Sequence, residues 1–84
     1  MYDYFFTFRS VTAAMDAKEL LEKSGIKAVL SRTPKSLKQQ GCGYSLRLRV
    51  ESPMTAKRIL EGERANYQRI YRKDELEQWR KVAL

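Results

Sequence analysis

The sequence predicts an α+β domain in which two helices cover one face of an antiparallel sheet. Three observations carry this prediction: strict apolar–polar alternation in residues 44–50, a helical apolar stripe in residues 11–24, and glycine or proline between short elements. The chain has 84 residues, of which 43% are hydrophobic and 32% charged, as in ordinary globular proteins. We therefore expect a single domain over residues 1–84.

The first elements are predicted to be a strand and a helix. Residues 2–9 are rich in aromatic side chains and partly alternate, which is typical of a strand. Residues 11–24 place five apolar side chains on one helical face: Ala13, Ala14, Ala17, Leu20 and Leu21. Ser10 or Thr12 can cap the start of this helix, and Gly25 stands where a left-handed residue often ends one.

A long loop separates two further predicted strands. Residues 26–31 form a short β-type run, and residues 32–43 are polar, basic and glycine-bearing, which indicates a loop. Residues 44–50 then alternate, so that one side chain set faces the core and the other faces outward. The inward set is Tyr44, Leu46, Leu48 and Val50, and the outward set is Ser45, Arg47 and Arg49.

The second helix is predicted to begin at Ser52, as N-cap, with Pro53 at its first position. Its inner face is Ala56, Ile59 and Leu60, and Gly62 ends it. Residues 66–72 follow as a fourth strand.

The last segment, residues 73–84, is predicted to be a short helical extension. Asp74 and Glu77 resemble a capping box at its start. Its apolar stripe is Leu76, Trp79 and Val82. Such a stripe can cover the open sheet face of its own chain or of a partner, so we expect a homodimer through this helix or through the open sheet face.

The order β-α-β-β-α-β over residues 1–72 matches the ferredoxin-like sandwich, which has a four-stranded sheet. Right-handed crossovers then place strand one between strands three and four. The 32–43 loop lies at the same end of the sheet as the exit of strand one. This topology brings Cys42 close to Arg9, Ser10 and Thr12.

Composition excludes several kinds of chemistry. The chain has one cysteine and no histidine, so it cannot form an internal disulfide, a Cys/His zinc site or a histidine-based catalytic pair. We expect no metal and no cofactor. No segment resembles a signal peptide or a bilayer span, so we expect a cytoplasmic protein with a reduced thiol. The net charge of +7 indicates an anionic partner without specifying its kind.

Cys42 is the residue best suited to chemistry. Flanking Gly41 and Gly43 remove side-chain obstruction, and Arg32, Lys35 and Lys38 favour the nucleophilic thiolate. Such a thiol can accept sulfur or selenium and hold it as a persulfide-type adduct. A free cysteine is also often only a small buried side chain, so a structural role for Cys42 stays open.

The stretch Arg32-Thr33-Pro34-Lys35, followed after a polar spacer by Gly41-Cys42-Gly43-Tyr44-Ser45-Leu46, resembles the signature of a small bacterial family of selenium/sulfur carrier-like proteins. The resemblance extends from about residue 3 to about residue 72 and includes Phe8, Ala14, the Leu20-Leu21…Gly25-Ile26 register and Ile70-Tyr71.

The resemblance implies a functional Cys42-Gly43 pair, a preceding Pro34-Lys35 pair, a carrier rather than an enzyme, and donor and acceptor proteins as partners. This chain departs from the pattern with Lys35 where arginine is commoner and with a bulky Tyr44. Lysine keeps the charge but lacks the bidentate fork of arginine.

Two other functions remain possible for this fold. RNA-recognition domains share the βαββαβ order and stack bases on sheet aromatics. Here Arg47 and Arg49 face outward, and Phe5, Arg69 and either Tyr67 or Tyr71 can share their face. However, strand three lacks the outward aromatics of that class. A regulatory or interaction domain without bound cargo is the other alternative.

Overall fold

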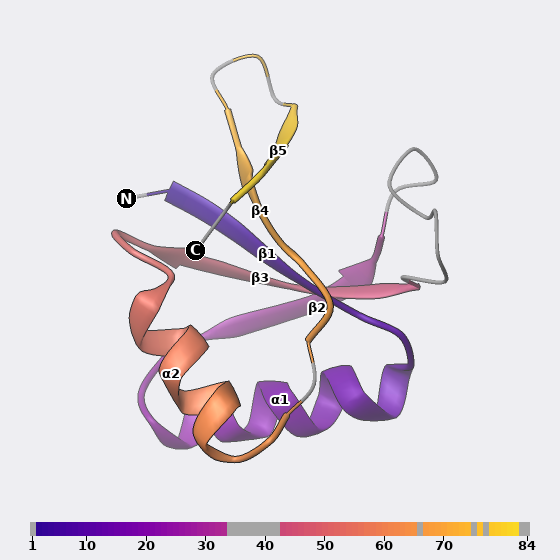
Figure 1. The fold of residues 1–84 in the computed structure, drawn as a ribbon, viewed down its shortest axis with the longest axis vertical. Helices are drawn as coiled ribbons and strands as arrows, with labels where there is room; N and C mark the ends of the chain where they lie inside the picture. Colours follow the sequence, from indigo (N-terminus) through magenta and orange to yellow (C-terminus); the bar gives the residue numbers. More distant parts are fainter. Residues whose placement is uncertain (1, 34–42, 66, 75, 77, 83–84) are drawn as a thin grey trace.

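The computed structural model describes residues 2–33, 43–65, 67–74, 76 and 78–82. Its elements are β1 (Tyr2–Phe8), α1 (Val11–Lys23), β2 (Ala28–Arg32), β3 (Tyr44–Val50), α2 (Met54–Gly62), β4 (Ile70–Lys73) and β5 (Trp79–Lys81). The strands form an antiparallel sheet of order β2-β3-β1-β4-β5. Both helices lie on one face of this sheet (Figure 1). The predicted α+β class and the position of β1 between β3 and β4 are confirmed.

The central strand β1 is buried on both of its faces. Tyr4, Phe6 and Phe8 belong to the core beneath the helices. Phe5 and Thr7, which alternate with them, point to the opposite face and are also buried. A strand that is covered on both faces needs no polar positions, which explains why residues 2–9 alternate only partly. The rest of the sheet is built outward from this strand.

Small residues bring the helices close to the sheet. Ala14 and Ala17 of α1 and Ala56 of α2 are buried against it, together with Leu21 and Leu60. Leu46 and Leu48 of β3 fill the same core. The predicted inner faces of both helices and the inward side of β3 are therefore confirmed.

The ends of α1 follow the sequence signals closely. The Ser10 side chain accepts a hydrogen bond from the Ala13 amide at 3.1 Å and caps the helix. Gly25, just beyond the last turn, has a φ of 85°, the left-handed conformation that glycine adopts without strain. In α2 the prediction is wrong by one residue, because Pro53 itself occupies the N-cap and Met54 begins the helix. The Ser52 hydroxyl accepts from the Met54 amide at 3.3 Å.

The strands on either side of the helices are shorter or shifted relative to the prediction. The second strand occupies Ala28–Arg32 instead of residues 26–31, and the fourth occupies Ile70–Lys73 instead of residues 66–72. Neither helix in the described ranges has the length and apolar content of a bilayer span.

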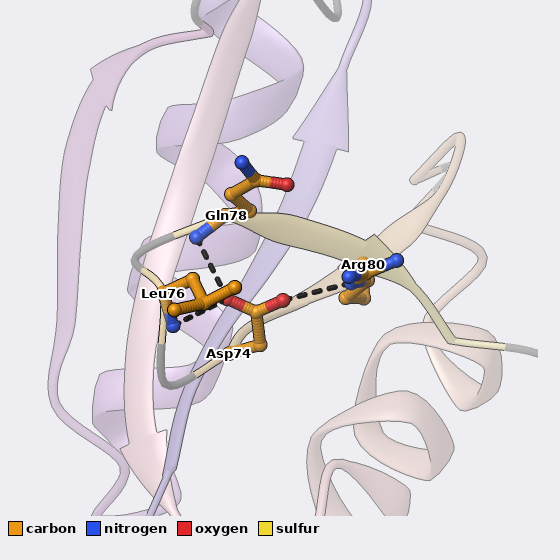
Figure 2. A network of polar contacts seen from close by, with 4 residues as sticks. All are labelled: Asp74, Leu76, Gln78 and Arg80. Atoms are coloured by element: carbon orange, nitrogen blue, oxygen red, sulfur yellow. Dashed lines mark hydrogen bonds and ion pairs between the residues drawn. The ribbon is translucent and has the colours of Figure 1, made fainter.

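The predicted C-terminal helix is wrong, because Trp79–Lys81 form the strand β5, which pairs with β4 as a hairpin. Asp74 is the key residue of the turn (Figure 2). Its Oδ1 accepts hydrogen bonds from the amides of Leu76 and Gln78, both at 2.9 Å. Its Oδ2 accepts from Arg80 Nε at 2.7 Å. An aspartate that satisfies local amides is common to helix starts and to turns, so the sequence signal was ambiguous. Glu77 lies outside the described residues.

The expected apolar stripe is divided between two environments. The Trp79 ring stacks on Phe5, with 3.8 Å between ring centroids and 24° between planes. Val82 packs against the core, and its amide donates to Ile70 at 2.8 Å. Leu76 is 74% exposed at the turn. The segment thus extends the sheet to five strands and covers its own chain. A C-terminal helix is not available as an interface, and the homodimer stays a prediction.

Asp74 makes the stability of the hairpin sensitive to acid. The hydrogen bond from Arg80, followed by that from the Gln78 amide, holds the pKa of Asp74 below its ordinary value of 3.8. Its contribution to stability is complete above the unfolded-state pKa and is lost as pH falls through the lower folded-state pKa. We expect Asp74→Asn to lower the melting temperature at neutral pH, and the difference from the wild type to shrink as pH falls through the lowered folded-state pKa of Asp74.

The measurement is thermal unfolding followed by Trp79 fluorescence, with Glu63→Gln as an exposed control. Equal melting temperatures for wild type and Asp74→Asn at neutral pH would contradict the role assigned to the carboxylate.

Candidate functional site

The loop predicted to hold the reactive thiol is anchored at its two ends. Its described ends are Thr33 and Gly43, which bond to each other: the Thr33 amide donates to the Gly43 carbonyl at 3.1 Å. The Gly43 amide donates to the Phe8 carbonyl at 3.2 Å, at the end of β1. Gly43 therefore lies at the exit of β1, where the strand order places it. We call Thr33, Gly43 and Phe8 the loop root.

Several predicted site residues fall in the loop itself. Pro34, Lys35, Lys38, Gly41 and Cys42 lie outside the described residues, and their roles stay predictions. Cys42 precedes Gly43 in the chain, so its backbone is one peptide bond away from the loop root.

A glycine at position 43 can act through its backbone conformation or through the absence of a side chain. Among the described glycines, only Gly25 has a positive φ, so Gly43 does not use the left-handed region. Among the described residues, a Cβ at Gly43 would meet the Arg9 carbonyl at the ordinary contact distance of 3.8 Å. The described surroundings therefore leave room for a small side chain at this position, and the loop-shaping role of Gly43 stays a prediction.

Of the predicted site-wall residues, Arg9 has the most informative contact. With the Gln68 amide oriented so that its oxygen faces the guanidinium, Arg9 Nε donates to it at 2.9 Å. The backbone N–H of Gln68 donates a hydrogen bond to the Thr7 carbonyl at 2.7 Å. Ser10 is engaged as the cap of α1, and Thr12 is exposed in its first turn. No local pattern marks Gln68 as a site residue, because its approach to β1 is a long-range contact.

A partly buried tyrosine, Tyr67, fixes the segment that carries Gln68. The Tyr67 ring packs edge-on against Phe6, with centroids 5.3 Å apart, and its hydroxyl donates to the Glu61 carboxylate at 2.8 Å. Burial, reinforced by this hydrogen bond, raises the pKa of Tyr67 to about 12. Tyr67 is therefore a structural anchor, and it lies on the helix side of the sheet.

Four hydroxyl side chains gather beside the loop root, on the sheet face away from the helices. We call Thr7, Ser31, Thr33 and Ser45 the hydroxyl cluster. Register places Ser45 opposite both Ser31 and Thr7, and the Ser31 and Ser45 oxygens are 3.3 Å apart. The Thr7 hydroxyl donates to the Arg69 carbonyl at 3.3 Å and accepts from its amide at 3.1 Å.

Thr33 differs from the other members of the cluster. It is 4% exposed, and its hydroxyl has no hydrogen-bond partner among the residues that the structure describes. Because Thr33 continues the β2 ladder, alternation puts its side chain on the face of Ser31 and Ser45. Buried hydroxyls without partners are uncommon and call for an explanation. Alternating Ser and Thr positions on both sides of the loop were the sequence signal for this cluster.

Arg32 is the described basic residue of the predicted anion-stabilising set. It is exposed, and its guanidinium lies 5.7 Å from the centroid of the Tyr44 ring. Tyr44 itself packs against the core on the helix side. The bulk of Tyr44 is thus directed to the face opposite the hydroxyl cluster.

The residues considered for RNA binding are only partly available. Arg47 and Arg49 are exposed and face outward, as predicted. Phe5 and Tyr71 share that face but are only 5% and 8% exposed. Tyr67 belongs to the helix side. A metal centre finds no support in the described part of the chain, which holds no cluster of three metal-ligating side chains.

The unpartnered hydroxyl of Thr33 leads to a stability prediction. Thr33→Val removes a buried polar group that gains no hydrogen bond, so we expect the free energy of unfolding to stay within about 1 kcal/mol of wild type or to rise. Thr7→Val is the matched control: it strips two hydrogen bonds from Arg69 and should cost about 1–3 kcal/mol. Urea denaturation measures both. A Thr33→Val loss as large as that of Thr7→Val would show that the hydroxyl has a partner.

Comparison with known proteins gives one match. The family described as "Putative Se/S carrier protein-like" matches residues 3–72, which include the whole loop and its root. No curated protein and no solved structure matches the chain. Because the family match covers most of the sequence and ends within β4, the chain belongs to the Se/S carrier protein-like family.

Proposed function

We propose that this protein carries sulfur or selenium on the side chain of Cys42 and delivers it to a second protein. The chain itself is not an enzyme in this proposal. Family membership supports the cargo class. The observation that carries the proposal is the anchoring of Gly43, the chain neighbour of the single cysteine, to the Phe8 carbonyl at the end of β1.

The proposed transfer is an exchange without net oxidation. The Cys42 thiolate attacks the terminal sulfur of a donor protein's persulfide, and a new S–S bond forms at Cys42. The old S–S bond of the donor breaks, and the donor cysteine leaves as a thiolate. Cys42 then holds a persulfide, and the acceptor's thiolate removes its terminal sulfur in the same way. A donor protein with an –S–SeH group transfers selenium in the same way. The Cys42 thiolate attacks the selenium, a new S–Se bond forms at Cys42, and the donor cysteine leaves as a thiolate. One cysteine is enough for this cycle.

The charge around the loop root supports the thiolate form. Arg9 and Arg32 lie at the two strand ends that flank the loop root, and α1 begins at Val11 with its positive dipole end. Lys35 and Lys38 add two cations in the loop sequence. Carboxylates are absent from the described loop-root residues, so nothing there opposes a negative sulfur.

The hydroxyl cluster supports the proposal in a second way. A cargo atom on Cys42 would be a polarisable anion that needs hydrogen-bond donors. The Thr33 hydroxyl is buried and has no partner in the described part of the chain, and the backbone of the same residue bonds to Gly43. In this position the Thr33 hydroxyl can donate a hydrogen bond to an anionic cargo atom, which is present only when Cys42 holds sulfur or selenium.

Alkylation of Cys42 is the direct test of thiol reactivity. We expect the folded protein to react with iodoacetamide with a midpoint below the free-thiol value of about 8.5, because nearby cations favour the thiolate. Intact mass against pH gives the midpoint. A thiol that reacts only after denaturant is added would show that Cys42 has a structural role and would refute the carrier.

Arg9 is the described cation whose contribution can be tested by substitution. Arg9→Gln should raise the alkylation midpoint by about half a pH unit, since an exposed charge acts weakly through water. Arg58→Gln removes the same charge from α2 and serves as control. Added salt should narrow the difference between the wild type and Arg9→Gln. Equal alkylation midpoints for Arg9→Gln and Arg58→Gln would show that Arg9 has no specific effect on the thiol.

Cargo loading tests the transfer step itself. Incubation with a persulfide donor, or with selenide and a disulfide-bearing Cys42 adduct, should add one chalcogen atom to the intact mass. Cys42→Ser should gain nothing. A mass gain that survives Cys42→Ser would assign the cargo to another group.

A further inference from the structure

Charge is divided unevenly between the two layers of the molecule. The two helices together carry four basic and four acidic residues, whereas the five strands carry seven basic residues and one acidic residue. Most helix cations are already paired within their own helix: Lys18 with Glu22, Lys23 with Glu19, and Lys57 with Glu61. The positive excess of the chain is therefore concentrated on the sheet.

One row of side chains crosses the sheet face that the helices do not cover. Register places these residues side by side from β2 to β5: Val29, Arg47, Phe5, Tyr71 and Lys81. Arg47 and Lys81 are exposed, and three strand spacings of about 4.8 Å separate them, or roughly 14 Å. Trp79 stacks on Phe5 between them. Two cations thus flank an aromatic centre.

The cations of this face have little compensation within the chain. Arg47, Arg49 and Lys81 have no ion-pair partner in the part of the chain that the structure describes. Arg47 and Arg49 point the same way from β3, about 7 Å apart along the strand, and repel each other. Only Asp3 lies opposite Arg49 in the register. An anionic partner would relieve this repulsion.

We propose that this surface, the outer basic face of Arg47, Arg49 and Lys81, binds an acidic segment of a partner protein. The 39% exposed Val29 at its border and the Trp79 ring add apolar contact area to the charge. The β4–β5 hairpin projects from the sheet on the side away from the helices (Figure 1). The proposal does not depend on the carrier function, because none of these residues belongs to the loop of Cys42.

The same observations disfavour two other occupants. Single-stranded nucleic acid binds open sheets by stacking bases on aromatic rings, but here Trp79 covers Phe5, and Tyr71 is buried. A second copy of this chain on this face would bring its basic residues close to those of the first, which argues against the open sheet face as the interface of the predicted homodimer. An acidic protein segment needs no exposed aromatic rings, and its charge is opposite to that of this face.

Binding of a fluorescein-labelled oligoglutamate peptide to the full chain tests the proposal. We expect saturable binding by fluorescence anisotropy that weakens with salt and changes Trp79 emission, since Trp79 is the single tryptophan and lies on this face. Arg47→Gln with Arg49→Gln should weaken binding about threefold to tenfold.

The matched control is Arg58→Gln with Lys23→Gln, which removes the same two charges from the helices. An equal loss of peptide affinity in both double variants would show that only the net charge of the chain matters, and it would overturn the proposal. Tighter binding of single-stranded oligothymidine, lost in the sheet variant, would overturn it in favour of nucleic acid. Unchanged binding by Cys42→Ser would support a surface separate from the carrier thiol, whatever the outcome of alkylation.

Discussion

The structure depends on the burial of β1 on both faces. Phe6 and Phe8 fill the core between the sheet and the helices. Phe5 points to the other face of the sheet, where Trp79 covers it. Each such ring contributes about 1.5–3 kcal/mol by leaving water. A strand held from both sides has a fixed end, and the carbonyls and amides at that end are where the loop root and the Gln68 segment attach.

The position of the candidate site follows directly from this constraint. The Phe8 carbonyl accepts from Gly43 on one side of β1, and Thr7 bonds with Gln68 and Arg69 on the other. Two segments that are far apart in sequence are thereby aligned by one strand. The loop between Thr33 and Gly43 therefore starts and ends on backbone that the sheet holds in place.

The fold could be predicted wherever one local pattern had one structural meaning. Strict alternation identified β3, and the spacing of alanine and leucine identified α1. The C-terminal segment failed because Asp74 can serve a helix start or a turn, and because Leu76, Trp79 and Val82 are spaced three apart by chance. What decided the outcome was the stacking of Trp79 on Phe5, a contact that no local window contains.

The site was predictable to a similar degree. Strand order alone placed the Gly43 end of the loop beside the exit of β1. The Thr33 hydroxyl and the Gln68 amide could not be found in advance, because their significance depends on register and on what each side chain meets after folding. Thr33 is also the clearest local inconsistency in the described chain, and such inconsistencies tend to mark functional positions.

The hairpin has a consequence for the edge of the sheet. Without β5, the strand β4 would present its unpaired amides and carbonyls to solvent, as a template for another chain. With β5, the edge is only three residues long and two of them, Arg80 and Lys81, are charged. Short, charged edge strands resist sheet-to-sheet association. The family match ends at residue 72, so this protection against aggregation comes from a segment beyond the matched region.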